Sequence, residues 1–280
     1  MRSRYIVKDL LRDVTATLDA AKIPRASREA QLLLMAYLNR DELWLITNQT
    51  TEIQKPLEEF FSWVERRSFN EPFEYITNRV NFYSEEFYID SGALIPRPET
   101  ELLLDEVKKH QPDLESKITF AEVGVGSGII SIMLAKSYKN AKFIAVDISQ
   151  KALDVAKKNI EKFGLQDRIE LRLGSLLEPV DEKIDYLVSN PPYIEDGIEL
   201  ESNLSYEPQN ALFGGKVGDE IIKELLDEVL RQNIKFFSCE MGYDQKDKIQ
   251  NYIRNKNNTS LEFYKDYSGF DRGFTLKVEN

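Results

Sequence analysis

After residue 98 the chain alternates between two hydrophobic periodicities, one typical of strands and one typical of helices. Short apolar runs rich in β-branched and aromatic residues predict strands, and apolar residues three and four apart predict helices. We expect strands at 118–123, 142–146, 169–173, 185–189, 234–239, 261–264 and 274–278, and helices at 99–109, 129–136, 150–163, 220–230 and 245–254. This order predicts an α/β domain whose mostly parallel sheet is wrapped by helices, with ligands at the carboxyl ends of the strands.

The residues before this region have a different pattern. From Val7 to about Phe69 the apolar residues recur at helical spacing, which predicts a small bundle of four or so helices. Residues 73–89 are aromatic and β-branched with polar interruptions, and they predict a β-hairpin with Ser84-Glu85-Glu86 near its turn. We therefore expect three parts: an N-terminal helical domain at 1–70, a linking hairpin at 71–95 and an α/β domain at 96–280.

Charge is unevenly distributed along the chain. Residues 1–70 carry a net charge of +1 and residues 71–280 a net charge of −12, which together give the −11 of the whole chain. An acidic domain repels phosphate backbones, so we do not expect direct binding of nucleic acid. We expect a monomer, although nothing in the sequence fixes the oligomeric state.

Cys239 is the only cysteine and His110 the only histidine. Their scarcity excludes disulfides, Cys/His zinc sites and Ser-His-Asp triads, so no metal site is expected. Cys239 lies in an apolar run and is interpreted as a core residue, whereas His110 ends a predicted helix and is interpreted as solvated. No apolar stretch is long enough to span a membrane and no signal peptide is recognisable, so we expect a cytoplasmic protein.

A glycine-rich turn follows the first strand of the α/β domain. It reads Glu122-Val123-Gly124-Val125-Gly126-Ser127-Gly128 and opens a helix, and Asp147 ends the next strand about 20 residues later. Glycines at such a turn let the backbone approach a ligand closely, and an acid at that distance binds ribose hydroxyls. The spacing G-x-G-x-G does not meet the dinucleotide fingerprint, so a nucleoside cofactor without a pyrophosphate fits better. The alternative is a glycine-rich turn that binds no ligand.

A second motif, Asn190-Pro191-Pro192-Tyr193, ends the fourth predicted strand of this domain. An amide side chain, two rigid residues and an aromatic ring can hold a planar –NH₂ group, with the Asn190 side-chain oxygen and the Pro191 carbonyl as acceptors. Methylating an amide or exocyclic nitrogen requires such a grip, because the lone pair of the nitrogen is delocalised. The alternative is a simple turn after a buried strand, since Asn-Pro commonly opens turns.

Together the glycine turn, Asp147 and the Asn190–Tyr193 motif indicate an S-adenosylmethionine-dependent methyltransferase. The chain resembles the HemK/PrmC family of protein-(glutamine-N5) methyltransferases over nearly its whole length. Besides the two motifs, the segments that carry the resemblance are residues 71–76, 94–101, 206–215, 240–245 and 265–272. The resemblance implies a Rossmann-like class I methyltransferase domain with an N-terminal helical domain, and methylation of the glutamine in the Gly-Gly-Gln motif of class-1 peptide chain release factors.

The resemblance also implies roles for individual residues. The catalytic segment would be Asn190, Pro191, Pro192 and Tyr193, and the cofactor would be held by Glu122, Gly124, Val125, Gly126, Ser127, Gly128, Asp147, Ser175 and Asn190. Two positions depart from the family pattern. Glu122 replaces a commoner aspartate, and Ser175 lies where an acid is frequent.

Two further segments have both a bland and a functional interpretation. Arg97, between Pro96 and Pro98, is either a surface arginine in a linker or part of a wall of the cofactor pocket. Glu207-Pro208, within a long loop after Tyr193, either walls the substrate pocket or braces the loop.

Three other functions stay open on the sequence alone. A methyltransferase for a glutamine of a ribosomal protein would need the same motifs, and so would an adenine N6-methyltransferase, since an exocyclic amine is also planar. The acidic α/β domain argues against the nucleic-acid enzyme. A cofactor-binding adaptor without catalysis is disfavoured by the intact Asn190–Tyr193 motif.

Overall fold

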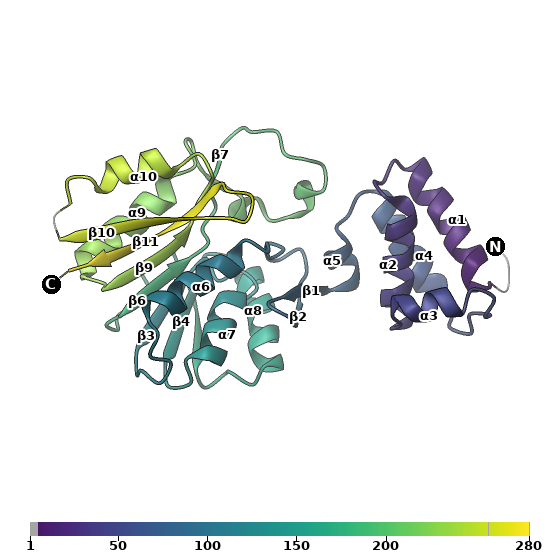
Figure 1. The fold of residues 1–280 in the computed structure, drawn as a ribbon, viewed down its shortest axis with the longest axis horizontal. Helices are drawn as coiled ribbons and strands as arrows, with labels where there is room; N and C mark the ends of the chain where they lie inside the picture. Colours follow the sequence, from purple (N-terminus) through teal and green to yellow (C-terminus); the bar gives the residue numbers. More distant parts are fainter. Residues whose placement is uncertain (1–4, 257, 280) are drawn as a thin grey trace. The chain divides into compact units, whose positions relative to one another are not determined.

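The computed structural model describes residues 5–256 and 258–279. The chain forms two compact units (Figure 1). The first runs to Arg79 and includes the later segment Glu201–Tyr206, and the second comprises Val80–Leu200 and Glu207–Asn280. The first unit therefore extends past the predicted boundary at residue 70 and takes in part of the loop after Tyr193.

The first unit is helical, as predicted. Its helices are α1 (Val7–Ala20), α2 (Ala26–Leu38), α3 (Glu42–Thr47), α4 (Glu58–Ser68) and α5 (Phe73–Thr77). On α1 the side chains of Val7, Leu10, Val14 and Leu18 are buried, which is the spacing of one helix face. They share a hydrophobic core with residues of α2 and α4, such as Leu33 and Phe60.

The predicted hairpin over residues 73–89 is wrong in its first part. Phe73–Thr77 forms α5, in which Tyr75 and Ile76 are buried and their N–H groups bond to the Pro72 carbonyl. Burial of the aromatic and β-branched residues thus overrides their strand propensity. The hairpin itself is shorter, with β1 (Arg79–Phe82) and β2 (Glu85–Tyr88) joined at Tyr83 and Ser84, both of which have positive φ.

The second unit contains the predicted seven-stranded sheet. Its order is β10-β11-β9-β6-β3-β4-β5. Strand β11 is antiparallel to both of its neighbours, β10 and β9, and the other pairs are parallel. The strands are β3 (Thr119–Val123), β4 (Lys142–Asp147), β5 (Ile169–Leu173), β6 (Tyr186–Ser189), β9 (Phe236–Glu240), β10 (Thr259–Lys265) and β11 (Asp271–Val278). Each lies within a few residues of its predicted position.

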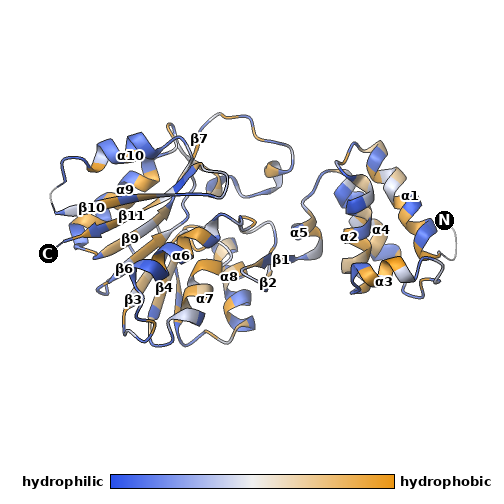
Figure 2. Ribbon diagram, in the orientation of Figure 1, coloured by the Kyte–Doolittle hydropathy of each residue, from blue (hydrophilic) through white to orange (hydrophobic). Residues whose placement is uncertain are grey.

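Helices cover both faces of the sheet (Figure 1). One face carries α6 (Thr100–His110), α7 (Ile129–Ser137) and α8 (Gln150–Lys162), and the other carries α9 (Glu220–Gln232) and α10 (Lys246–Ile253). Side chains alternate along the strands, so Ala121 and Val123 of β3 join the core beneath α9 and α10. Figure 2 shows the resulting hydrophobic colouring of the strands and of α7, whose residues Ile129–Ala135 are all buried.

The prediction that His110, the single histidine, is solvated is wrong. The His110 ring lies 5.2 Å from the ring of Phe236, and its side chain is only 7% exposed. Burial lowers the pKa of His110 from its ordinary value. The last turn of α6 points back onto the sheet, a packing direction that the helix-ending sequence does not reveal. Cys239, by contrast, is fully buried in the core as predicted.

The remaining elements are short and lie in the long loop after the Asn190–Tyr193 motif. They are β7 (Ile194–Glu195), η1 (Leu204–Tyr206), η2 (Gln209–Ala211) and β8 (Phe213–Gly215). Strands β7 and β8 pair in parallel outside the main sheet. The Ile194 N–H group also bonds to the Leu212 carbonyl, so both ends of this loop are tied together directly behind Tyr193.

The sheet core can be tested with two phenylalanines of the second unit. Phe237 is fully buried and packs edge-on against Phe274 at 5.5 Å, whereas Phe270 is 55% exposed. Phe237→Ala should lower the free energy of unfolding by about 3–5 kcal/mol, because it leaves a cavity in the core. Phe270→Ala should change it far less. Urea denaturation of both variants measures the difference, and equal losses would contradict the assigned core.

Candidate active site

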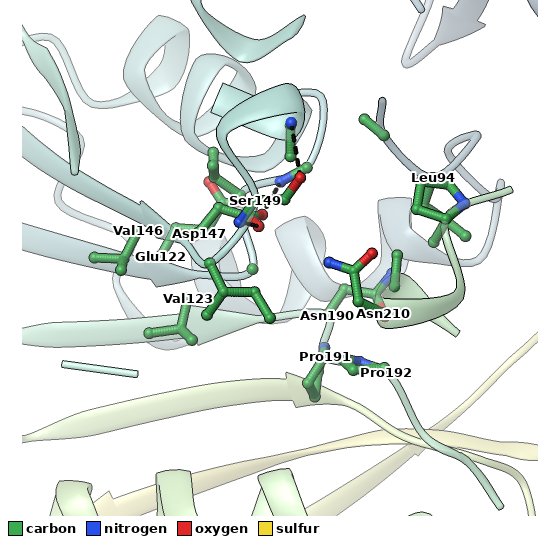
Figure 3. A pocket seen from close by; sticks show the side chains of 18 of the residues that line it. Leu94, Glu122, Val123, Val146, Asp147, Ser149, Asn190, Pro191, Pro192 and Asn210 are labelled. Atoms are coloured by element: carbon green, nitrogen blue, oxygen red, sulfur yellow. Dashed lines mark hydrogen bonds between the residues drawn. The ribbon is translucent and has the colours of Figure 1, made fainter. Parts of the chain in front are cut away.

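A cavity opens at the carboxyl edge of β3, β4 and β6, where the sheet order reverses around β3. Figure 3 shows Asp147 and Ser149 on one side of it, and Asn190, Pro191 and Pro192 on the other. All the predicted site residues line this cavity except Gly128 and Tyr193. Those that do are Glu122, Gly124, Val125, Gly126, Ser127, Asp147, Ser175, Asn190, Pro191 and Pro192.

The turn after β3 is bound to the carboxylate at the end of β4. The Gly126 N–H group donates to Asp147 Oδ2 at 3.0 Å, and the Ser149 N–H group donates to Oδ1 at 2.9 Å. Gly126 has φ +53°, a conformation that side chains disfavour. Burial raises the pKa of Asp147, and the backbone donors act against that shift. These bonds fix the carboxylate at the mouth of the turn.

Gly128 has a packing role instead of a place in the cavity wall. It precedes α7 with φ +83°, and a Cβ atom there would lie 3.3 Å from the Cβ of Ala156 on α8. Glycine at this position therefore lets α7 and α8 approach each other closely. The motif's last glycine positions the helices that carry the turn.

Glu122 is a buried carboxyl group at the floor of the cavity. Its side chain is almost inaccessible, and its Oε2 atom accepts hydrogen bonds from the N–H and hydroxyl groups of Ser131. Oε1 is buried without a hydrogen-bond partner among the described residues. Burial raises the pKa of Glu122 to about 8. A neighbouring ammonium group would both ionise this carboxyl and satisfy its free oxygen.

The Asn190 segment is anchored on both sides. Before it, the Ser189 hydroxyl donates to the Val123 carbonyl, which ties β6 to β3. After it, the Gln245 side-chain amide donates to the Tyr193 carbonyl at 3.0 Å and to the Gly218 carbonyl at 2.9 Å. Asn190 itself donates through Nδ2 to Thr100 Oγ1 at 3.2 Å.

Tyr193 does not line the cavity. Its hydroxyl donates to Glu240 Oε1 at 3.3 Å, and its ring packs against the core beneath α9 and α10. Burial, with Glu240 nearby, raises the pKa of the Tyr193 phenol. The ring therefore supports the motif from behind, which differs from the expected packing against the substrate.

Arg97 does not line the cavity, although the nearby residues Leu94 and Pro96 do. The Arg97 guanidinium pairs with Glu207, whose Oε2 atom also accepts from the Ile95 N–H group at 3.0 Å. Glu207 thus braces the loop after β7. The next residue, Pro208, lines the cavity.

Several lining residues were not predicted. They include Ile148, Ser149, Thr100, Leu176, Asn210 and Ile221. Ile148 directly follows the acid of β4 and is 60% exposed. Because Ile148 directly follows Asp147 in the sequence, its place on the cavity wall could have been predicted. Asn210 and Ile221 carry no such signal, because they come from elements that converge only in the fold.

The described residues contain no group of three or more histidine, cysteine, aspartate or glutamate side chains suited to hold a metal ion. Among the same residues, no helix is both long enough and apolar enough to cross a membrane.

Known proteins match both units. Residues 9–77 match the PrmC N-terminal domain, and residues 90–207 match the methyltransferase small domain. The release factor glutamine methyltransferase of Clostridium acetobutylicum is 33% identical over 276 residues, covering 95% of this chain and 96% of the relative. The enzyme of the same name from Clostridium botulinum is 37% identical, covering 95% and 97%.

Solved structures share the fold at low identity. The catalytic domain of human Mettl16, solved with an RNA hairpin, has a TM-score of 0.58 and 13% identity, covering 82% of this chain and 86% of that one. A ribosomal protein L11 methylase from Lactobacillus delbrueckii has a TM-score of 0.50 and 22% identity, covering 69% and 84%. At such identities the likeness concerns the fold alone.

The seven-stranded sheet and these neighbours define a class I S-adenosylmethionine-dependent methyltransferase. The full-length matches are more specific: the chain belongs to the family of release factor glutamine methyltransferases.

The raised pKa of Glu122 predicts how stability depends on pH. Between the ordinary value of 4.5 and about 8, folded Glu122 keeps a proton that the unfolded chain releases. The free energy of unfolding of the ligand-free protein should therefore fall as pH rises through this window. Glu122→Gln removes the titration, so its melting temperature should fall less steeply between pH 5 and pH 8.

Thermal melts of wild type and Glu122→Gln at several pH values measure this slope. Glu178→Gln, at an exposed position, serves as the control and should keep the wild-type slope. Parallel curves for wild type and Glu122→Gln would contradict a neutral, buried Glu122.

Proposed function

We propose that this chain transfers a methyl group from S-adenosylmethionine to the side-chain amide nitrogen of the glutamine in the Gly-Gly-Gln motif of class-1 peptide chain release factors. The observation that carries the proposal is the position of Asn190, Pro191 and Pro192 on the wall of the same cavity as Asp147 and the glycine turn. The names of the full-length relatives support the release factor as the substrate.

We assign the cofactor to the side of the cavity formed by β3 and β4. Asp147 would accept from the ribose hydroxyls, and the free Oε1 atom of Glu122 suits the ammonium group of the methionine part. Both Ile148 and Ser175 line the cavity. Ile148 would offer an apolar surface to the adenine ring, and the Ser175 hydroxyl would accept from the adenine amine. Gly124, Val125, Gly126 and Ser127 line the cavity at the turn, against which the cofactor would lie.

The chemistry required of the protein is mainly positioning. The cofactor supplies an electrophilic methyl group, and the glutamine amide is a weak nucleophile because its lone pair is delocalised. Asn190 Oδ1 and the Pro191 carbonyl would accept from the two amide hydrogens, which aims the nitrogen and increases its electron density. No histidine reaches the motif, since His110 is packed against Phe236. The proton is therefore expected to leave to water after methyl transfer, with S-adenosylhomocysteine as the other product.

The proposed partner is a protein and not a nucleic acid. Residues 71–280 carry the net charge of −12 noted above, which disfavours a phosphate backbone. The proposal also includes action as a monomer in the cytoplasm, where release factors work.

A mass spectrum of a release-factor peptide tests the function directly. After incubation with enzyme and S-adenosylmethionine, the peptide containing Gly-Gly-Gln should gain the mass of one methyl group, located on the glutamine. A release factor with that glutamine replaced by glutamate should gain none. Methylation of ribosomal protein or plasmid DNA, with the release factor left unmodified, would overturn the proposal.

Substitution of Asn190 separates catalysis from cofactor binding. Asn190→Ala removes an acceptor for the amide hydrogens and should reduce turnover by about 100-fold or more, comparable with the loss of one oxyanion donor. The dissociation constant of S-adenosylmethionine should change far less than turnover, because Asp147 and Glu122 are untouched. Single-turnover kinetics and calorimetry measure the two quantities, and near-normal turnover would exclude the proposed role of Asn190.

A further inference from the structure

A chain of buried hydrogen bonds lies behind Asn190. Asn190 Nδ2 donates to Thr100 Oγ1 at 3.2 Å, and the Thr100 hydroxyl donates to Glu240 Oε2 at 2.7 Å. Tyr193 donates to the other oxygen of the same carboxyl group at 3.3 Å. Thr100 and Glu240 are each only 1% exposed. The four residues come from the end of β6, the start of α6 and the end of β9, and they meet only in the folded chain.

The direction of these bonds follows from the groups involved. Above its pKa the Glu240 carboxylate is ionised and can only accept, so it takes the single hydroxyl proton of Thr100. The Thr100 oxygen then has only lone pairs to offer, so Asn190 must present its NH₂ group to Thr100. The Asn190 carbonyl oxygen is consequently left for the cavity.

The reverse orientation of Asn190 would not serve catalysis. With the amide turned by half a revolution, Asn190 would direct its NH₂ group at the NH₂ group of a substrate amide, and two donors cannot bond to each other. Nothing in the shape of an asparagine side chain prevents this turn, because its oxygen and nitrogen ends are nearly equal in size. The orientation of the Asn190 amide therefore depends on the hydrogen-bond donors and acceptors behind it.

We propose that Thr100 and Glu240 are positioning residues that fix the orientation of the Asn190 amide, so that the site accepts a primary amide nitrogen as a hydrogen-bond donor. This inference rests on the proposed function and adds two residues to it, neither of which contacts the reacting atoms. Tyr193 contributes by occupying the second oxygen of Glu240, which leaves the first for Thr100.

The surroundings of Glu240 make this arrangement sensitive to pH. The groups that face it are Glu99 just before α6, Thr100 on α6, Tyr193 after β6, Tyr264 on β10, Arg272 on β11 and Cys239 on β9. Burial raises the pKa of Glu240 to about 7, while Thr100, Arg272 and Tyr193 act to lower it. When Glu240 is protonated it can donate to Thr100, which frees the Thr100 proton to bond to the Asn190 oxygen instead.

The kinetic test uses three variants on the release-factor substrate. Thr100→Val keeps the side-chain shape but removes the hydroxyl, and turnover should fall about 10-fold, while the KM for S-adenosylmethionine stays close to that of wild type. Thr100→Ser restores the hydroxyl and should recover most of the loss. In wild type at saturating S-adenosylmethionine, where the ammonium group would keep Glu122 ionised, turnover should decline below pH 7, and Glu240→Gln should remove this acid limb.

A second readout does not depend on turnover. The ¹⁵N signal of the Asn190 side-chain amide, assigned by its disappearance in Asn190→Ala, should shift with pH around 7 in wild type. It should lose that shift in Thr100→Val and in Glu240→Gln. The titration also tests the positioning role if Thr100→Val folds poorly, because the comparison of wild type with Glu240→Gln does not need that variant.

The outcomes separate the two proposals. Thr100→Val with wild-type turnover, or an acid limb that persists in Glu240→Gln, would overturn the positioning role while leaving the proposed function intact. Wild-type enzyme that leaves the release factor unmethylated would overturn the function, and the amide titration would still report on the hydrogen-bonded chain. If Thr100→Val and Thr100→Ser lost the same amount of turnover and the same amount of melting temperature, the role of Thr100 would be structural and the positioning role would be overturned.

Discussion

Parallel hydrogen bonding among β4, β3, β6 and β9 is the constraint on which the site depends. Parallel strands end at the same edge of a sheet, so residues distant in sequence arrive together. Asp147 ends β4, the glycine turn follows β3, Asn190 follows β6 and Glu240 ends β9. A shift of one residue in any of these pairings would turn the polar groups at the strand ends towards the opposite layer of helices.

The sequence was informative wherever a local pattern reports a local structure. Strand and helix periodicities predict the seven strands of the main sheet and the five helices that cover it, because their apolar residues are buried between the sheet and the helices. The glycine turn and Asp147 were found because their spacing is set by one βαβ unit. For Phe73–Thr77 the strand prediction is wrong, since the aromatic residues suit a strand locally but are buried in the helical unit.

Other parts of the site could not be found locally. Thr100 and Glu240 are 140 residues apart in sequence, and no spacing rule relates the start of a helix to the end of a strand that follows so much later. Gly128 was identified by the motif but given a ligand role, whereas its neighbours in space show a packing role. Tyr193 belongs to the Asn190–Tyr193 motif, yet only the fold reveals that its ring turns towards the core.

The loop after β7 contributes a short segment of sequence to the first unit, although the residues on both sides of that segment belong to the second unit. Glu201–Tyr206 packs with the first unit, where Ser202 accepts from Asn70 at 2.5 Å and Tyr206 donates to the Phe69 carbonyl at 2.8 Å. The next residue, Glu207, belongs to the second unit and braces Ile95. The helical unit is thus built from two separate stretches of sequence. Recombination that exchanged only the first 79 residues would bring in a bundle mismatched to this inserted segment, so the two stretches are expected to be inherited together.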